Sequence, residues 1–399
     1  MKRIKYIYFF RGDLDSHVDI YKSWVDVSKD SIDISLFTIL DNKTFIKQEE
    51  KVKYYKKQGV VILKTPRFCK KIFTILYFTY LCIFFDKVVV HLRKQSPKPF
   101  DMLKKIFKKK LKYIIDIEGD FESEIDFLSN PKHKYKPKFY NNIISSMKIN
   151  TINLKEKLFK ADGVFLATEI HKSIYMNRYG QELNNKLFVI PTGFDSSKFF
   201  IDENKREEYR KKYKLEDKLV MIYSGNIFYS WQNISRTIKL FKLLKKEFYQ
   251  NLYLIILTRK QDFYIAEEFI KKNNLEQEDF LLENVAFDKV NYFLNASDIG
   301  ILLRDNHILN NIATTAKIGE YLSSGLHVIT SKYIGLYSKE MEKASIGILL
   351  DDIYDNNEIL SKIKNYNFNN SREEISKWAS DSFSVQAYKD KYISALQSL

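Results

Sequence analysis

Short apolar runs alternate along the chain with longer segments in which apolar residues recur at helical spacing. In the first half, the apolar runs of strand length are residues 4–10, 32–40, 60–64, 88–90, 113–117, 162–168 and 187–190. Segments with the pattern of helices lie among them at residues 16–28, 43–58, 139–160 and 171–179. This alternation predicts a parallel sheet with helices on its faces.

The second half repeats the pattern after a boundary near residue 195. Pro and Gly in the run PTGFD, residues 191–195, turn the chain out of the first sheet, and we interpret the charged segment 202–217 as a linker region. Further strands are predicted at residues 219–223, 252–258, 280–285, 299–303, 328–329 and 347–350, with helices at 234–249, 356–364, 373–380 and 385–397. We therefore predict an α/β protein with domains at residues 1–195 and 196–380, followed by a terminal segment at 381–399.

A strand that leads into a helix makes residues 298–330 the most informative stretch. The apolar run ends at Arg304, a polar loop follows, and a helix begins at Thr314 or Thr315. The first N–H groups of this helix, near Thr314, Thr315 and Ala316, and the positive end of its dipole favour a bound anion. We therefore predict an anion site where this helix begins.

Two charged side chains on this helix extend the prediction. Lys317 places a positive charge in the first turn, and Glu320 follows on the same helical face. A carboxylate in that position is suited to accept hydrogen bonds from the two hydroxyl groups of a ribose. The alternative is that the stretch is an ordinary buried strand–helix–strand unit of a doubly wound fold.

Two other predicted strands of the second half end in residues suited to a nucleotide. Gly225 and Asn226 follow one of these strands, and a glycine there lets the backbone approach a ligand closely. Arg259 ends the next strand and brings a positive charge to the same edge, because ligands of such sheets bind at the carboxyl ends of the strands. Trp231 is either a wall for stacking or a packing residue at the start of a helix.

The first half carries a comparable group of polar residues and glycines. They lie after the first predicted strand or at the ends of the fourth and fifth: Gly12, His91, Arg93, Asp116, Gly119 and Glu124. By the same rule, we expect them at the ligand-binding edge of the first sheet. His91 is either a structural cap or a catalytic group, since an imidazole serves in both roles.

The charge balance narrows the class of partner. The formal net charge is +16, with 66 Lys and Arg residues, which suits a nucleic acid, an acidic membrane surface or a phosphorylated substrate. The alternative is that lysine is simply abundant in this proteome, together with Asn and Ile. The sequence contains no recognisable nucleic-acid-binding module and no zinc-ligand spacing, so we expect no nucleic-acid partner and no metal.

An apolar stretch at residues 69–85 precedes the basic run KKIFKKKLK at residues 104–112. Its uninterrupted part has about 14 residues, fewer than the roughly 20 that span a bilayer. It is either a helix that dips into a membrane interface, with the lysines among anionic headgroups, or a core helix beside a solvated basic segment. Cys69 and Cys82 lie in or beside the stretch and are expected to be reduced thiols of a cytosolic protein.

Four groups of residues occur in a recognisable order: HLR at 91–93, DIEG at 116–119, PTGFD at 191–195 and KIGEYL at 317–322. Together they resemble the GT-B glycosyltransferases of the family-4, retaining type, in particular a bacterial surface-polysaccharide subgroup. The chain departs from the common pattern at three positions. Thr315 stands where proline is usual, Glu118 where arginine is usual, and Ile312 where a second glutamate contacts the donor sugar.

The resemblance implies two Rossmann-like doubly wound domains facing across a cleft, with the last helix crossing back to the first domain and a hinge near Asp195. It implies sugar transfer from a nucleotide-sugar with retention at the anomeric carbon, and no cofactor. Lys317 would neutralise the leaving diphosphate, Glu320 would hold the ribose, and His91 would line the donor sugar or the cleft. The implied donor-binding residues are Gly225, Asn226, Trp231, Arg259, Arg304, Thr314, Thr315, Ala316, Lys317 and Glu320, and the implied acceptor-side residues are Gly12, His91, Arg93, Asp116, Gly119 and Glu124.

The implied acceptor is a glycan or a lipid-linked glycan in bacterial surface-polysaccharide synthesis. The expected place is the cytoplasm, with peripheral attachment to the inner face of the cell membrane. Two other hypotheses stay open. One is a catalytically inactive GT-B protein that acts as a binding or complex-forming subunit, which Ile312 and Glu118 favour. The other is a different GT-B enzyme, such as a nucleotide-sugar epimerase, which should carry more acidic and histidine residues in its cleft.

Overall fold

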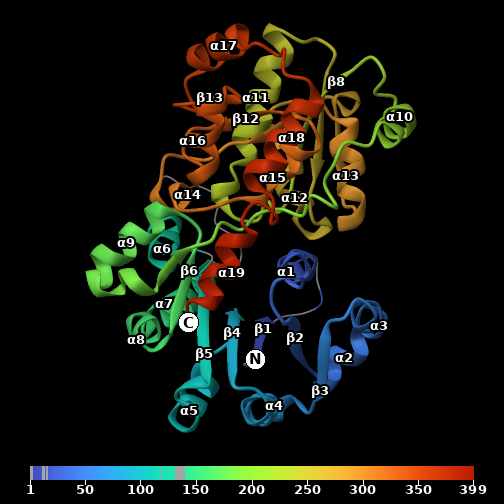
Figure 1. Cartoon of the computed structure of the whole chain (residues 1–399). Helices are drawn as coiled ribbons and strands as arrows, with labels where there is room; N and C mark the ends of the chain where they lie inside the picture. The colour runs from blue at the N-terminus through green and yellow to red at the C-terminus, as the bar shows by residue number, and fades with distance from the viewer. Residues whose placement is uncertain (1–2, 11–13, 15–16, 118, 131–139) are drawn as a thin grey trace. The chain divides into compact units, whose positions relative to one another are not determined.

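The computed structural model describes residues 3–10, 14, 17–117, 119–130 and 140–399. The chain divides into two compact units (Figure 1). Unit 1 comprises residues 1–118, 152–191 and 385–399, and unit 2 comprises residues 119–151 and 192–384. Gly12 and Glu118, two positions on which the sequence analysis relied, lie outside the described residues.

Unit 1 contains a seven-stranded parallel sheet of order β3-β2-β1-β4-β5-β6-β7. Strand β1 pairs with β2 on one side and β4 on the other, so the strand order reverses between β1 and β4. The strands are β1 (Ile4–Phe10), β2 (Ile34–Asp41), β3 (Val61–Thr65), β4 (Lys87–Arg93), β5 (Leu111–Ile117), β6 (Gly163–Leu166) and β7 (Leu187–Val189).

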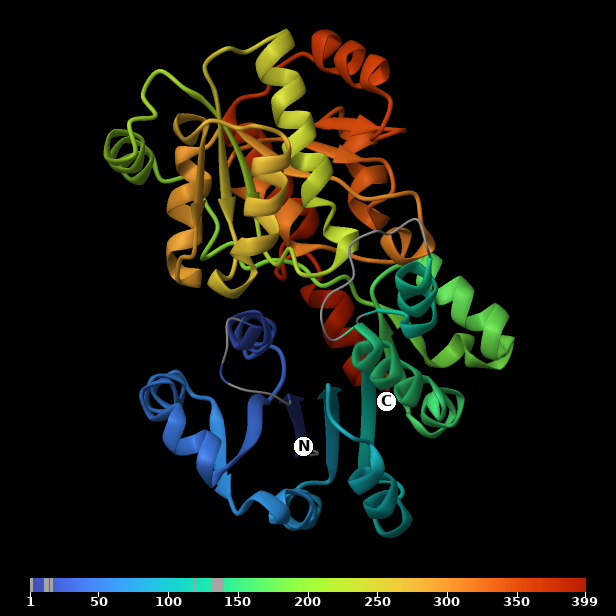
Figure 2. The ribbon, with the colours of Figure 1, turned by 180° about the vertical axis from the view of Figure 1, so that it is seen from behind.

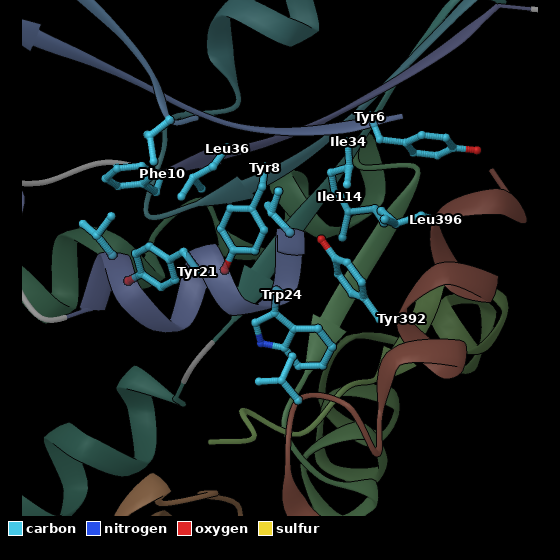
Figure 3. Close-up of a cluster of buried hydrophobic side chains, with 14 of the residues drawn as sticks. Tyr6, Tyr8, Phe10, Tyr21, Trp24, Ile34, Leu36, Ile114, Tyr392 and Leu396 are labelled. Atoms are coloured by element: carbon cyan, nitrogen blue, oxygen red, sulfur yellow. The ribbon is translucent and has the colours of Figure 1, made fainter. Parts of the chain in front are cut away.

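Helices cover both faces of this sheet because successive side chains of a strand point to opposite faces. From β1, Tyr8 enters one buried cluster with side chains of α1, α3 and α19, and Phe9 enters another with side chains of α4, α5, α8 and α9. Figure 3 shows the first cluster, in which Tyr21 of α1 lies beside Tyr8 of β1 and Trp24 of α1 lies beside Tyr392 of α19. The helices are α1 (His17–Ser28), α2 (Asn42–Lys47), α3 (Glu49–Lys57), η1 (Arg67–Cys69), α4 (Lys70–Phe84), α5 (Lys98–Ile106), α8 (Leu154–Lys160), α9 (Glu169–Tyr179), η2 (Gln181–Lys186) and α19 (Lys389–Gln397).

The last helix of the chain, α19, belongs to unit 1. The rings of Trp24 and Tyr392 lie 4.8 Å apart between their centroids, and Tyr392 and Leu396 are almost fully buried. The chain therefore returns to its first unit after completing the second, where the resemblance places its last helix.

Unit 2 contains a six-stranded parallel sheet of order β10-β9-β8-β11-β12-β13, seen from two sides in Figures 1 and 2. Its order reverses between β8 and β11, as that of unit 1 does between β1 and β4. The strands are β8 (Leu219–Ser224), β9 (Leu252–Leu257), β10 (Phe280–Glu283), β11 (Ile299–Leu302), β12 (His327–Ser331) and β13 (Ile348–Leu350). The prediction of two Rossmann-like α/β domains is thus confirmed.

Two helices of unit 2, α6 and α7, come from residues 119–151, a segment that lies in the sequence between two segments of unit 1. They are α6 (Phe121–Ser129), α7 (Tyr140–Thr151), α10 (Glu203–Lys212), η3 (Ser230–Gln232), α11 (Ile234–Glu247), η4 (Lys260–Asp262), α12 (Phe263–Lys272), η5 (Gln277–Asp279), α13 (Phe287–Ala296), α14 (Ile308–Asn311), α15 (Ala316–Ser323), α16 (Gly335–Ala344), α17 (Asn356–Asn365) and α18 (Arg372–Phe383).

Three sequence-based expectations of secondary structure are wrong. The helix expected at 43–58 is two helices, α2 and α3, separated at Gln48, and the described part of the helix expected at 139–160 is divided between α7 and α8. The β-branched pair Thr151 and Ile152 lies at this second break, and such residues are poor helix formers. The segment interpreted as a linker, 202–217, forms helix α10, whose N-cap is the carboxylate of Asp202.

Candidate functional site

The reversal of strand order in unit 2 brings the ends of β8 and β11 together. Gly225 follows β8 with a φ of +133°, a conformation that residues with a side chain rarely adopt. A Cβ atom there would lie 2.0 Å from Cε and 2.8 Å from Nζ of Lys317. Because position 225 is a glycine, the Lys317 side chain can lie directly against the backbone at the end of β8.

Helix α15 begins at the same place, with Ala316 as its first residue. Thr315 occupies the N-cap position but its side chain does not cap the helix. The hydroxyl of Thr314, the other candidate cap, instead lies 2.8 Å from that of Thr192. Among the described residues, no side chain therefore satisfies the first N–H groups of α15, and these donors are available to an anion.

The side chains of Lys317 and Glu320 are partly buried, and within the described part of the chain neither side chain forms a hydrogen bond or an ion pair. Burial and the nearby charge of Arg304 lower the pKa of Lys317 to about 8, although Glu320 opposes this shift. Burial raises the pKa of Glu320 to about 7, although Lys317 opposes that shift. Two partly buried charges without direct partners cost free energy, so their arrangement indicates a site that a charged, hydroxyl-bearing ligand completes.

We expect the pKa of Glu320 to appear in the pH dependence of stability. The folded protein binds this proton more tightly than the unfolded chain, whose pKa is near 4.5, so the stability gained below that pH is lost as the pH rises through about 7. The side chain of Glu320→Gln does not titrate, so the variant should not lose this stability as the pH rises. Its free energy of unfolding minus that of the wild type should therefore increase by on the order of 1–3 kcal/mol from about pH 5 to about pH 7.5. Denaturant unfolding at both pH values measures this, and a difference that does not change with pH would contradict it.

Arg304 links the end of β11 to the loop that carries Trp231. Its side chain is 8 % exposed, its Nη1 donates to the carbonyl oxygen of Trp231 at 2.8 Å, and its backbone N–H donates to the Ser331 hydroxyl. Burial lowers the pKa of the Arg304 guanidinium. The structure thus places a second cation within electrostatic range of Lys317.

Arg259 and Asn226 lie together at the ends of β9 and β8. Nη2 of Arg259 donates to Oδ1 of Asn226 at 3.1 Å, and its Nε donates to Asp262 at 2.8 Å. Half of the Arg259 side chain stays exposed, so the guanidinium remains accessible to a ligand. The positive charge predicted at the carboxyl end of β9 is therefore next to the loop that follows β8.

Aromatic side chains that the sequence analysis did not single out surround Trp231. Its ring stacks on that of Tyr229, with centroids 4.3 Å apart and planes 6° from parallel, and it meets Phe127 edge-on. Glu124 of the same helix, α6, interacts electrostatically with Tyr229 and raises the pKa of that phenol, which burial also raises. The signal was present in the cluster FYSW at 228–231, but a run of aromatic residues is more often core than site.

His307 is a second residue that sequence reasoning missed. Its Nδ1 accepts a hydrogen bond from the backbone N–H of Leu309, so Nε2 carries the proton and donates to Asp126 of α6 at 3.0 Å. The ring also meets Phe127 edge-on. Helix α6 thus contacts the loop after β11, a long-range contact that no local pattern indicates.

The polar residues of unit 1 form a buried network at the ends of β4 and β5. His91 is 4 % exposed; its Nδ1 lies 3.1 Å from the Tyr392 hydroxyl and its Nε2 lies 3.0 Å from Oδ2 of Asp116. Arg93 pairs with the same carboxylate. Burial lowers the pKa of His91, whereas Arg93 and His91 overcome the effect of burial on Asp116 and lower its pKa to about 2.

The structure therefore divides the predicted residues into two groups. Unit 2 brings Gly225, Asn226, Trp231, Arg259, Arg304, Lys317 and Glu320 to neighbouring strand ends, with Thr314, Thr315 and Ala316 at the start of α15. His91, Arg93 and Asp116 lie in unit 1, while Gly119 and Glu124, predicted to accompany them, belong to unit 2. Among the residues that the structure describes, no group of three or more His, Cys, Asp or Glu side chains is arranged to hold a metal ion.

Residues 205–380, most of unit 2, match the family model described as "Glycosyl transferases group 1". The match begins within α10 and ends within α18, and it includes both the turn at Gly225 and helix α15. A search of curated proteins found no match.

Solved structures share the fold over the whole chain at low sequence identity. HepE from Anabaena, in complex with UDP, is 13% identical with a TM-score of 0.66, and the alignment covers 100% of both chains. A glycosyltransferase from Rickettsia africae is 14% identical with a TM-score of 0.63, covering 100% of this chain and 98% of that one. A TarM mutant from S. aureus, in complex with fondaparinux, alpha-GlcNAc-glycerol and UDP, is 12% identical with a TM-score of 0.64, covering 99% and 100%. The similarity identifies the fold as GT-B.

Proposed function

We propose that the protein is a glycosyltransferase that transfers a sugar from a nucleotide-sugar and holds the donor diphosphate at the start of α15. The observation that carries this proposal is the placement of Lys317 over Gly225, beside uncapped N–H groups and within range of Arg304. Backbone donors and fixed cations that converge on one point favour a doubly charged leaving group. The match of residues 205–380 to the group 1 glycosyl transferases supports the same assignment.

The proposed chemistry needs the protein to stabilise negative charge as the bond between the sugar and the diphosphate breaks. Lys317 and the first N–H groups of α15 neutralise the departing phosphate, and Arg304 and Arg259 add positive potential around it. Glu320, one turn along the helix, accepts hydrogen bonds from the ribose. We propose that the configuration at the anomeric carbon is retained and that protein cations replace a divalent metal in this role.

We propose UDP as the first nucleotide to test, because HepE and the TarM mutant were each solved with UDP. The acceptor is proposed to be a glycan or a lipid-linked glycan of a surface polysaccharide, presented at the inner face of the cell membrane. Arg93 is proposed to serve the acceptor, since its side chain is partly exposed, and His91 and Asp116 act as its positioning residues.

A second candidate function is a GT-B protein that binds a nucleotide-sugar without transferring it. Ile312 motivates it, because this position carries a buried apolar side chain, 1 % exposed, where the resemblance places a glutamate that contacts the donor sugar. Such a protein would keep the diphosphate site and lose the contact that orients the sugar.

A panel of nucleotide-sugars tests the proposal. We expect one donor to raise the melting temperature of the purified protein and to be slowly hydrolysed, with release of the nucleoside diphosphate. Stabilisation by a donor with no hydrolysis, and no transfer to any glycan acceptor, would favour the binding subunit. Conversion of one sugar into its epimer would assign the protein to the epimerases. If no nucleotide-sugar raises the melting temperature, the glycosyltransferase, the binding subunit and the epimerase are all contradicted.

A further inference from the structure

Helix α4 of unit 1 exposes apolar side chains along one side. The exposed fractions reach 56 % for Ile72, 60 % for Leu76 and 61 % for Ile83, and Phe68 in the turn before the helix is 92 % exposed. Such values are unusual for large apolar residues that are adjacent to one another. We call this set, with Phe73, Tyr80 and Phe84, the α4 stripe.

The α4 stripe is one continuous face of the helix. At about 100° per residue, the exposed positions of α4 fall within a sector of about 120°. The buried residues Thr74, Phe78 and Leu81 occupy the opposite side, where Phe78 packs on Phe9 and Phe100. The helix therefore already has its full core contact, and the stripe is a second apolar face.

The neighbouring helix α5 extends the same surface. Figure 1 shows α4 and α5 at the same end of unit 1, and Met102 and Ile106 of α5 are 49 % and 74 % exposed. We group these two side chains with the α4 stripe as one apolar patch, because α4 and α5 contact each other. An exposed apolar patch of this kind on a folded unit indicates a surface that binds another protein or a membrane.

Positive charge surrounds the patch. Arg67 and Lys71 precede or begin α4, Lys105 lies in the last turn of α5, and Lys108 and Lys109 follow that helix. All five are exposed and, in the described part of the chain, none forms an ion pair. No Asp or Glu occurs between Lys51 and Phe85. Other lysines of the basic run are used internally, since Lys104 and Lys112 pair with Asp162.

We propose that the α4 stripe and the exposed lysines around it dock unit 1 on an anionic lipid bilayer. The apolar side chains insert at the level of the headgroups, and the lysines bind lipid phosphates, as expected for an interfacial helix. Among the described residues, we find no helix that could span a membrane.

The charge argues for lipid rather than a second copy of the chain. In a two-fold dimer the same patch would face itself, and the exposed lysines of both copies would meet at the rim. Like charges in that position oppose association, whereas an acidic bilayer offers opposite charge around an apolar interior.

Vesicle sedimentation tests the proposal. We expect the full-length protein to bind phosphatidylcholine vesicles that contain phosphatidylglycerol and to bind pure phosphatidylcholine far less. The variant Lys105→Gln/Lys108→Gln/Lys109→Gln should lose roughly hundredfold in apparent affinity, at about fivefold per lysine. The variant Ile72→Ser/Leu76→Ser/Ile83→Ser should lose at least about tenfold, because it removes the apolar insertion.

Two matched controls separate these effects from general loss of charge or hydrophobicity. Lys211→Gln/Lys239→Gln/Lys246→Gln removes three exposed lysines of unit 2, and Ile149→Ser/Ile152→Ser removes two exposed isoleucines, 67 % and 72 % exposed. Both should bind vesicles like the wild type. Donor hydrolysis in solution should be unchanged in every variant. A loss of vesicle binding can therefore be distinguished from a loss of the proposed glycosyltransferase activity.

Cysteine labelling gives an independent measure of insertion. Cys69 is partly exposed beside the stripe, whereas Cys82 is buried and its thiol has a pKa raised to about 11 by burial, so an environment-sensitive fluorophore should react at Cys69. We expect its emission to shift to the blue on vesicles with phosphatidylglycerol. No vesicle binding by the wild type, equal binding by the α4 variant, or a lipid-free dimer that the α4 variant dissociates would overturn the proposal.

Discussion

Lys317→Met is expected to lower the turnover of the donor by about 10²–10³-fold, the usual cost of removing one group that stabilises transition-state charge. Methionine keeps most of the length and packing of the side chain against Gly225 and removes only its charge. The melting temperature of the free protein should not fall, because the lysine has no hydrogen bond or ion pair within the described part of the chain. Steady-state release of nucleoside diphosphate measures the effect.

A matched control for this variant is Lys289→Met, which removes an exposed lysine of α13 in the same unit. We expect its turnover to equal that of the wild type. If both variants lose the same activity, the effect reflects the overall charge of unit 2, and Lys317 has no special role in the site.

Gly225→Ala is expected to destabilise unit 2 by about 1–3 kcal/mol and to weaken donor binding at least about tenfold. The new methyl group would lie 2.0 Å from Cε of Lys317, on backbone that has a φ of +133°. The lysine must therefore leave its place at the end of β8, and the diphosphate loses its cation. Chemical denaturation and calorimetric titration with the donor measure the two effects.

Two further variants separate crowding from backbone strain. Gly59→Ala also places a side chain at positive φ, +82°, but with no atom within 4 Å, so it should cost only the strain. In Gly225→Ala/Lys317→Ala the crowding partner is gone, and the loss of stability should be smaller than the sum of the single changes. Strict additivity would show that the two residues do not touch in solution.

The sequence predicted the fold because its signals are local. Strand β1 was predicted with its observed bounds, Ile4–Phe10, since an apolar run between polar segments needs no distant information. The break between α2 and α3 was missed because charged and polar residues continue across it. The break between α7 and α8 was missed because Thr151 and Ile152 disfavour a helix only weakly. Helix α10 was missed because ten residues with little apolar character give no periodic signal.

The site could be anticipated only in part. Gly225 was predicted because it directly follows a strand, and Lys317 because it stands in the first turn of a predicted helix. The parallel topology then brings the ends of β8 and β11 together. The contact of α6 with this region, through Phe127 and His307, depends on residues 180 positions apart in sequence. The sequence left His91 as either a structural cap or a catalytic group. Its contact with Tyr392 of the last helix joins residues far apart in the chain, so no local pattern could predict it.

Calorimetric titration of UDP and UMP into the wild type and Lys317→Met tests the central claim most directly. The claim is that Lys317 binds the diphosphate, so wild-type protein should bind UDP much more tightly than UMP, by about 2 kcal/mol or more for a charge-assisted contact. In Lys317→Met this preference should largely disappear while the affinity for UMP stays near that of wild type. An equal preference for UDP in both proteins would contradict the account.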